Sequence, residues 1–209
     1  MHTGGSSVLS SVDPTPSVTG PSKKPRGPRA DALRNRDKLV QAARAAFATS
    51  DGALPLEGIA REAGVGIGTL YRHFPTREAL VEAVYAAELD DVTDSAPALL
   101  DELAPDAALR AWMERYAAFV AMKRGMADTL RAGWASGRIA TPATRERITA
   151  AVATLLAAGA EAGSLRADVE PQDVSVMLMG IFLVGAAYNT REQTGRLIDL
   201  VMDALRPSR

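Results

Sequence analysis

Apolar residues recur through most of this chain at the three- and four-residue spacing of amphipathic helices. Between positions 56 and 63, four of them fall on one helical face: Leu56, Ile59, Ala60 and Ala63. Gly64 follows at once, and glycine is the usual residue just past a helix end. A second short helix is expected from position 66 or 67 to His73, with Leu70 and Phe74 on one side. Two short helices joined by a glycine turn predict a helix-turn-helix.

The opposite side of the second short helix carries small and polar residues suited to DNA. Gly68 would let the backbone come close to a base edge, and Thr69 can bond a base or touch a thymine methyl. Tyr71, Arg72 and His73 are donors suited to phosphate oxygens. Most helix pairs of this kind do not bind DNA, so the spacing alone leaves a purely structural role open. A dinucleotide-binding loop is rejected, because the third glycine comes one residue early and a helix precedes it.

The same periodicity predicts helices on both sides of this motif. The first is expected over residues 32–49. Its buried stripe consists of Leu39, Val40, Ala43, Ala46 and Phe47. Thr76 is a good N-cap for a fourth helix, which should run to about Val92 and connect two domains.

Beyond Ser95 the chain is expected to be helical, because no run of alternating β-branched residues indicates a sheet. Helices are predicted over about 106–123, 126–136, 141–163, from 171 onward and over 191–206. Thr141 followed by proline is a typical helix start, and Pro171 opens the next helix in the same way. The predicted fold class is therefore all-α.

Charge is divided unevenly along the chain, although the formal net charge is only −1. Residues 22–77 hold eleven Lys and Arg against five Asp and Glu, whereas residues 78–209 hold thirteen against nineteen. A positive excess around the helix-turn-helix favours a nucleic-acid partner there. Residues 1–30 are rich in Ser, Pro, Gly and Thr and are expected to form a disordered tail. The basic end of this tail either tracks DNA or only aids solubility.

A longer run carries a resemblance to a known family. The sequence IAREAGVGIGTLYRHFPTREALVEAVY, which begins at Ile59, resembles the DNA-binding domain of the tetracycline-repressor (TetR) family of bacterial transcription regulators. The resemblance is sharp from about Leu33 to Tyr85, and beyond that it rests mainly on the layout of helices. It implies a tail over residues 1–30, an N-terminal three-helix helix-turn-helix domain over 31–92, and a helical effector-binding and dimerisation domain over 93–209.

The resemblance also implies roles for the matching residues. The family's base contacts fall on Ile67, Gly68 and Thr69, and its phosphate contacts fall on Tyr71, His73 and Arg77. One departure is Pro55, which stands where the family often has a Ser or Thr whose hydroxyl caps the helix and reaches a phosphate. Gly58 is a second departure, since glycine is a poor helix former where a larger residue is commoner.

Candidate pocket residues cluster in the second domain, where family members bind effectors. They are Trp112, Tyr116, Phe119, Met126, Trp134 and Met177. Aromatic and methionine side chains suit an apolar or aromatic small molecule. The alternative is that this stripe is ordinary helix core.

Residues 174–187 are apolar on nearly all sides and, at fourteen residues, too short to span a membrane. Such a helix must be buried on every side, so one face is predicted to meet a second copy. The candidate interface residues on this helix and the last one are Met179, Phe182, Leu183, Ala186, Ile198, Val201, Met202 and Leu205. The alternative is a monomer in which the last helix alone covers that face.

These observations predict a sequence-specific regulator that binds a palindromic operator as a homodimer in the bacterial cytoplasm, on the nucleoid when bound. It would be a repressor released by a small-molecule effector; a DNA-binding protein without a ligand response, or an activator, would carry the same motif. An enzyme is disfavoured. The only histidines are His2 and His73, there is no cysteine, and the acidic residues lack metal-ligand spacing, so no catalytic residue, metal or cofactor is expected.

Overall fold

The computed structural model describes residues 28–49, 55–126, 141–185 and 191–207, with Met1 and a few single positions between 130 and 139. These residues form helices and no strand, which confirms the all-α prediction. The helices are α1 Pro28–Thr49, α2 Leu56–Glu62, α3 Ile67–His73, α4 Arg77–Glu102, α5 Pro105–Gly125, α7 Pro142–Glu161, α8 Pro171–Gly185 and α9 Arg191–Ala204. Residues 2–27, most of the helix expected at 126–136, and the candidates Trp134 and Ala186 lie outside the described residues.

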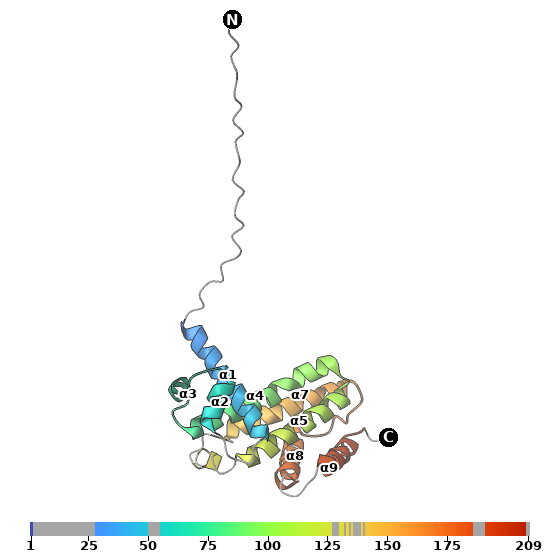
Figure 1. Cartoon of the computed structure of the whole chain (residues 1–209). Helices are drawn as coiled ribbons and strands as arrows, with labels where there is room; N and C mark the ends of the chain where they lie inside the picture. The colour runs from blue at the N-terminus through green and yellow to red at the C-terminus, as the bar shows by residue number, and fades with distance from the viewer. Residues whose placement is uncertain are drawn as a thin grey trace.

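The helices fall into two groups that share α4. Figure 1 shows α1, α2 and α3 gathered at one end of α4, while α5 and α7 lie along the rest of it and α8 and α9 stand beyond them. The N-terminal group packs on a small core made by Leu39, Val40, Ala43, Ile59, Ala60, Leu70, Phe74 and Leu80. Helix α1 begins at Pro28, so residues 28–30, expected in the tail, are helical because proline suits a first turn.

Helix α4 is longer than the sequence predicted. It was expected to end near Val92, but it continues to Glu102 with Pro97 inside it. Ala96 and Leu99 carry on the buried stripe of Val92 at helical spacing, so ending the helix at residue 92 would expose them. A proline removes one backbone hydrogen bond, and this burial offsets the loss. One continuous helix therefore joins the two helix groups.

The second group begins and ends its helices largely where the sequence predicted. The Thr141 hydroxyl accepts a hydrogen bond from the Thr144 amide at 3.3 Å, which caps α7, and Pro171 opens α8. Gly163 ends α7 with φ +69°, a left-handed conformation that favours glycine.

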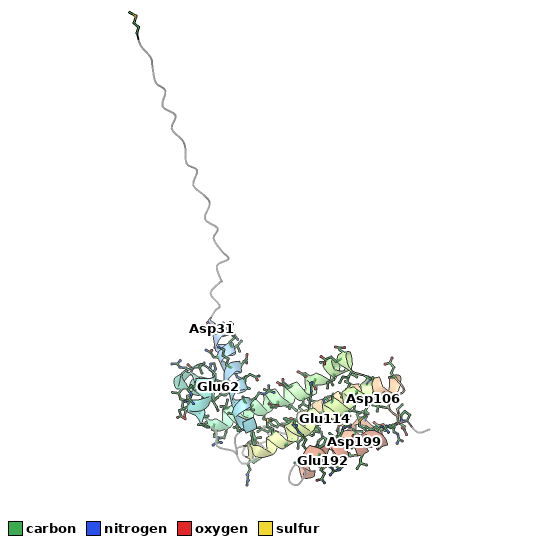
Figure 2. The ribbon with its side chains drawn as sticks, turned by 45° about the vertical axis from the view of Figure 1, so that its right-hand side comes forward. Asp31, Glu62, Asp106, Glu114, Glu192 and Asp199 are labelled. Carbon is green, nitrogen blue, oxygen red and sulfur yellow. The ribbon has the colours of Figure 1, made fainter. Side chains whose placement is uncertain are left out.

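Helix α9 is attached to the rest of this group by α5 and by the α7–α8 loop. Arg110 on α5 pairs with Asp199 on α9 and lies 3.4 Å from Glu114; Figure 2 shows both carboxylates over these helices. The Arg166 amide donates to the Leu205 carbonyl at 2.9 Å. One side of α9 therefore packs against other helices of the same chain. None of the described helices is long and apolar enough to cross a membrane.

Candidate nucleic-acid interface and effector cavity

The turn between α2 and α3 has the geometry that the sequence predicted. Gly64 adopts φ +68°, and its amide donates to the Arg61 carbonyl at 3.1 Å. The Val65 amide donates to the Ala60 carbonyl at 2.9 Å. This pair of bonds is the Schellman motif, which satisfies the last carbonyls of α2 and turns the chain sharply. The position of α3 therefore depends on a glycine at residue 64.

One side of helix α3 is packed against the rest of the domain, and the opposite side is exposed to solvent. Leu70 is fully buried and Phe74 nearly so, and the Arg36 guanidinium from α1 lies 5.4 Å from the Phe74 ring centroid. On the other side, Tyr71 is 46% exposed and Ile67 is 38% exposed. Both side chains are apolar in large part and are accessible to another molecule.

The seven residues proposed for DNA contact lie together on α3 and at the start of α4. Ile67, Gly68, Tyr71 and Arg72 are exposed, whereas Thr69, His73 and Arg77 are partly buried. No atom outside its own helix and chain neighbours lies within 4 Å of where a Cβ on Gly68 would stand, so another molecule can approach its backbone. Helix α3 contains no carboxylate, and Arg72 and His73 occupy its last turn. This face can accept phosphate oxygens without repelling them.

The two departures at the start of α2 prove to be related. Pro55 is the N-cap of α2 and provides no side-chain cap, so the hydroxyl contact expected of the family is absent here. A Cβ on Gly58 would lie 3.3 Å from Cγ of Pro55, which is tighter than nearly all real contacts of this kind. The absence of a side chain at position 58 therefore leaves room for the Pro55 ring.

A cavity of about 130 Å³ lies between α4, α5, α7 and α8. It is lined by Tyr85, Tyr116, Phe119, Val120, Lys123, Thr141, Thr144, Arg145, Ile148, Ser175, Val176, Met179 and Leu183. Of the residues proposed from the sequence, Tyr116 and Phe119 line it. Trp112 and Met126 are core residues instead: both are buried, and the Trp112 indole donates to the Val92 carbonyl at 2.9 Å. Met177 lies on an exposed side of α8 and does not line the cavity.

Sequence reasoning missed most of the lining, and one missed residue had a visible signal. Lys123 follows Tyr116 and Phe119 at the spacing of one helical face, so the aromatic stripe of α5 ends in a cation. Its ammonium lies 5.8 Å from the Tyr85 ring centroid, and burial lowers the pKa of Lys123. Burial, with a smaller effect of Tyr85, raises the pKa of the Tyr116 hydroxyl to about 12, which keeps it a proton donor at neutral pH.

A groove between α1, α4 and α5 lies next to this cavity. On its wall Arg44 of α1 holds two carboxylates of α4, with Nε 2.6 Å from Glu88 Oε1 and Nη2 2.6 Å from Asp91 Oδ2. Arg44 and Glu88 are each about one-fifth exposed, so solvent screens the Arg44–Glu88 pair less than a surface pair. Phe119 lines both the groove and the cavity. The Phe119 side chain is therefore shared by the cavity and by the groove beside the contact between α1 and α4.

Some of the residues predicted to form the dimer interface are buried within the chain, and others are exposed. Phe182, Ile198, Val201 and Leu205 are buried within the subunit, which removes them from any surface that could meet a second copy, and Met202 is partly buried. Met179 and Leu183 are exposed. Other large apolar side chains left exposed on α8 and α9 are Val176, Met177 and Leu200.

Comparisons with known proteins agree with this two-part layout. Residues 39–84 match the bacterial regulatory proteins of the tetR family, and residues 104–207 match the C-terminal domain of SbtR-like transcriptional regulators. Comparison with curated protein sequences gives no match.

Two solved structures are similar over most of their length. A TetR transcriptional regulator from Streptomyces coelicolor is 47% identical, with 83% of this chain and 99% of that chain covered and a TM-score of 0.73. A TetR transcription regulatory protein from Mycobacterium vanbaalenii is 34% identical, with 86% and 99% covered and a TM-score of 0.68. The resemblance seen in the run that begins at Ile59 is thereby confirmed.

Proposed function

We propose that this chain, which belongs to the TetR family of bacterial transcription regulators, is a dimeric repressor that a small molecule releases from a palindromic operator. The observation that carries the proposal is the path of α4. Its first turn holds Arg77 beside α3, and Tyr85, eight residues or about 12 Å further along the axis, lines the cavity. A ligand that moves Tyr85 would act on the helix that supports the DNA-facing surface.

The contacts of α1 support this route. Glu88 and Asp91 lie within two turns of Tyr85 and bind Arg44, so α1 should follow any movement of α4. Phe119, between the cavity and the groove beside Arg44, gives a ligand a second way to act on the same junction. Both routes end at the helices that hold α3 in place.

The difference in ligand affinity that is needed to release the operator favours a dimer with two cavities. A change from about 1:99 to 99:1 between two states needs roughly 10⁴-fold tighter binding to the favoured state. Two equivalent cavities would each have to supply only about 100-fold, or about 2.7 kcal/mol, which lies within the usual range of coupling energies. A ligand without such a difference in affinity would leave the operator occupied.

Exposed apolar side chains support a partner surface on α8 and α9. Met177 and Leu200 are exposed and lie outside the cavity, and Leu200 is 65% exposed. Large apolar side chains that are exposed on two helices in contact favour burial against a second copy. A dimer would present two α3 helices to successive major grooves, which is how a helix-turn-helix protein reads a palindrome.

The test is selection of bound fragments from the genome of the source organism at roughly physiological salt, followed by sequencing. We expect an enriched inverted repeat, bound by an even number of copies in mass photometry. The Tyr71→Ala variant serves as a control that keeps the fold and should enrich the repeat poorly. If the folded wild-type protein enriches no sequence at this salt or at lower salt, the proposal is wrong.

The sign of regulation needs a separate measurement. Transcription in vitro from a promoter that contains the enriched repeat should fall when the protein is added. A rise would identify an activator. Metabolites made or exported by the products of the neighbouring genes should then restore transcription, and a complete lack of response would leave a DNA-binding protein without an effector.

A further inference from the structure

We propose that the cavity between α4, α5, α7 and α8 binds a compact organic carboxylate whose charged group meets Lys123. This inference rests on the ligand-responsive function proposed above and names the chemical class of the ligand. Three features of the cavity support the inference: the charge of its lining residues, its volume and its apolar walls.

The charges that line the cavity have one sign. Lys123 and Arg145 are its ionisable cations, and none of the described lining residues is an aspartate or a glutamate. Lys123 is partly buried, whereas Arg145 is exposed on α7. The region as a whole is acidic, with nineteen Asp and Glu against thirteen Lys and Arg in residues 78–209, so the cationic lining is a local exception. A cavity of this kind attracts anions and repels amines.

Lys123 is partly buried, and desolvation of its ammonium disfavours the charged form. Its ammonium faces the Tyr85 ring at 5.8 Å, and burial lowers its pKa. A bound carboxylate would form a charge-assisted hydrogen bond with this ammonium and replace part of the water that it has lost.

The rest of the lining sets the size and shape of the ligand. An engineered cavity of about 150 Å³ is large enough for benzene, and this one has about 130 Å³. Its walls are aromatic at Tyr85, Tyr116 and Phe119 and aliphatic at Ile148 and Leu183. A single ring or a short branched chain fits these dimensions and these walls.

Hydroxyl groups near the cation can bind a second oxygen. The Tyr116 hydroxyl remains protonated at neutral pH, because burial raises its pKa to about 12. The Ser175 hydroxyl already donates to the Pro171 carbonyl at 2.8 Å, so it can offer a ligand only an acceptor. Tyr85, Tyr116, Thr141 and Thr144 also line the cavity with hydroxyl groups, and those of Thr141 and Thr144 lie 3.4 Å apart. Of these, the Tyr116 hydroxyl is the donor on which the inference relies.

The test compares acids with their uncharged amides. Benzoate, phenylacetate and 3-methylbutanoate are paired with benzamide, phenylacetamide and 3-methylbutanamide, and binding to the full chain is measured by calorimetry and thermal shift at pH 7. At least one acid should bind tenfold or more tightly than its amide, since a hydrogen bond between two charged groups is stronger than one to a neutral amide.

Three variants assign the effect to Lys123. Lys123→Met keeps the apolar stem and should remove the preference for the acid, whereas Lys123→Arg should retain it. Arg196→Met removes an exposed cation on α9 and should leave binding unchanged. The proposal fails if no acid binds at millimolar concentration, if acid and amide bind equally, or if Lys123→Met keeps the preference.

The outcomes separate this inference from the proposed function. A wild-type protein that enriches its operator but binds no acid would refute only the carboxylate. A protein that binds an acid through Lys123 but enriches no DNA would refute the repressor and leave the binding site in place.

Discussion

The DNA-facing surface and the cavity of this chain are built in opposite ways. On the seven-residue helix α3, the residues proposed for contact lie outside, and separate residues, Leu70 and Phe74, hold the helix in place. In the cavity, Tyr116 and Phe119 line the space and are also almost fully buried among neighbouring helices. The comparison indicates that the proposed DNA-facing surface can change without loss of stability, whereas the buried aromatic residues in and around the cavity cannot.

The largest expected effect is at Trp112, next to the cavity. Trp112→Ala should lower the free energy of unfolding by about 3–5 kcal/mol, the usual loss for a fully buried aromatic side chain. The substitution also removes the 2.9 Å hydrogen bond to the Val92 carbonyl and the stacking on Tyr116. Urea denaturation measures the loss, and Ile67→Ala on the exposed side of α3 should change stability by less than about 0.5 kcal/mol. A loss below about 1 kcal/mol for Trp112→Ala would show that Trp112 lines a space rather than fills the core.

A smaller effect, on binding alone, is expected on α3. Tyr71→Ala should weaken binding to all DNA sequences by about tenfold, or about 1.4 kcal/mol, as the loss of a phosphate contact would. Its unfolding midpoint should stay that of the wild type, because the Tyr71 side chain is 46% exposed. Fluorescence anisotropy on specific and scrambled duplexes measures both affinities. The matched variant Thr69→Ala should instead change the ratio between them, and an unchanged affinity for Tyr71→Ala would contradict the proposed orientation of α3.

The same contrast explains what the sequence could predict. Gly64, the Thr76 cap and the Leu70–Phe74 pair act over a few residues, so local stereochemistry identified the helix-turn-helix. The cavity depends on packing between distant segments, since Tyr85 and Leu183 line the same space. Residue type does not separate core from cavity lining.

The predictions that proved wrong also depended on packing between segments distant in the sequence. The end of α4 was missed because Pro97 interrupts the pattern and hides the stripe that continues to Leu99. Ile198 and Val201 were assigned to a dimer surface because the sequence does not show that α9 packs on α5.

Gly68→Ala tests whether binding and stability are independent on the DNA-facing surface. Apart from its own helix and chain neighbours, the new Cβ meets no atom of the described residues within 4 Å. Alanine is also a better helix former, so stability should rise by up to about 1 kcal/mol. Affinity for DNA should fall, because the methyl group occupies the space needed for close approach of the backbone. Gly195→Ala in α9 is the control, since its Cβ is equally unobstructed and it should stabilise without affecting DNA binding. If Gly68→Ala binds DNA as tightly as the wild type, the backbone at residue 68 does not approach the bases.

The smallest expected effect is at Lys123. Here a substitution in the cavity is expected to raise stability rather than lower it. Burial puts the pKa of Lys123 in the folded chain below its ordinary value of 10.5, so the unfolded chain binds this proton more tightly. The resulting loss of stability is fully present at neutral pH and disappears as pH rises from the lowered pKa to 10.5. Lys123→Met should therefore raise the melting temperature at pH 7 by less than about 4 °C, the shift that about 1 kcal/mol produces in a chain of this size.

The difference between wild type and Lys123→Met should narrow at alkaline pH, and Lys38→Met on the exposed side of α1 should show no such difference. A Lys123→Met variant that is less stable than the wild type at pH 7 would make Lys123 a structural residue. A more stable variant would show that the desolvation of the Lys123 charge outweighs the contact of its ammonium with the Tyr85 ring.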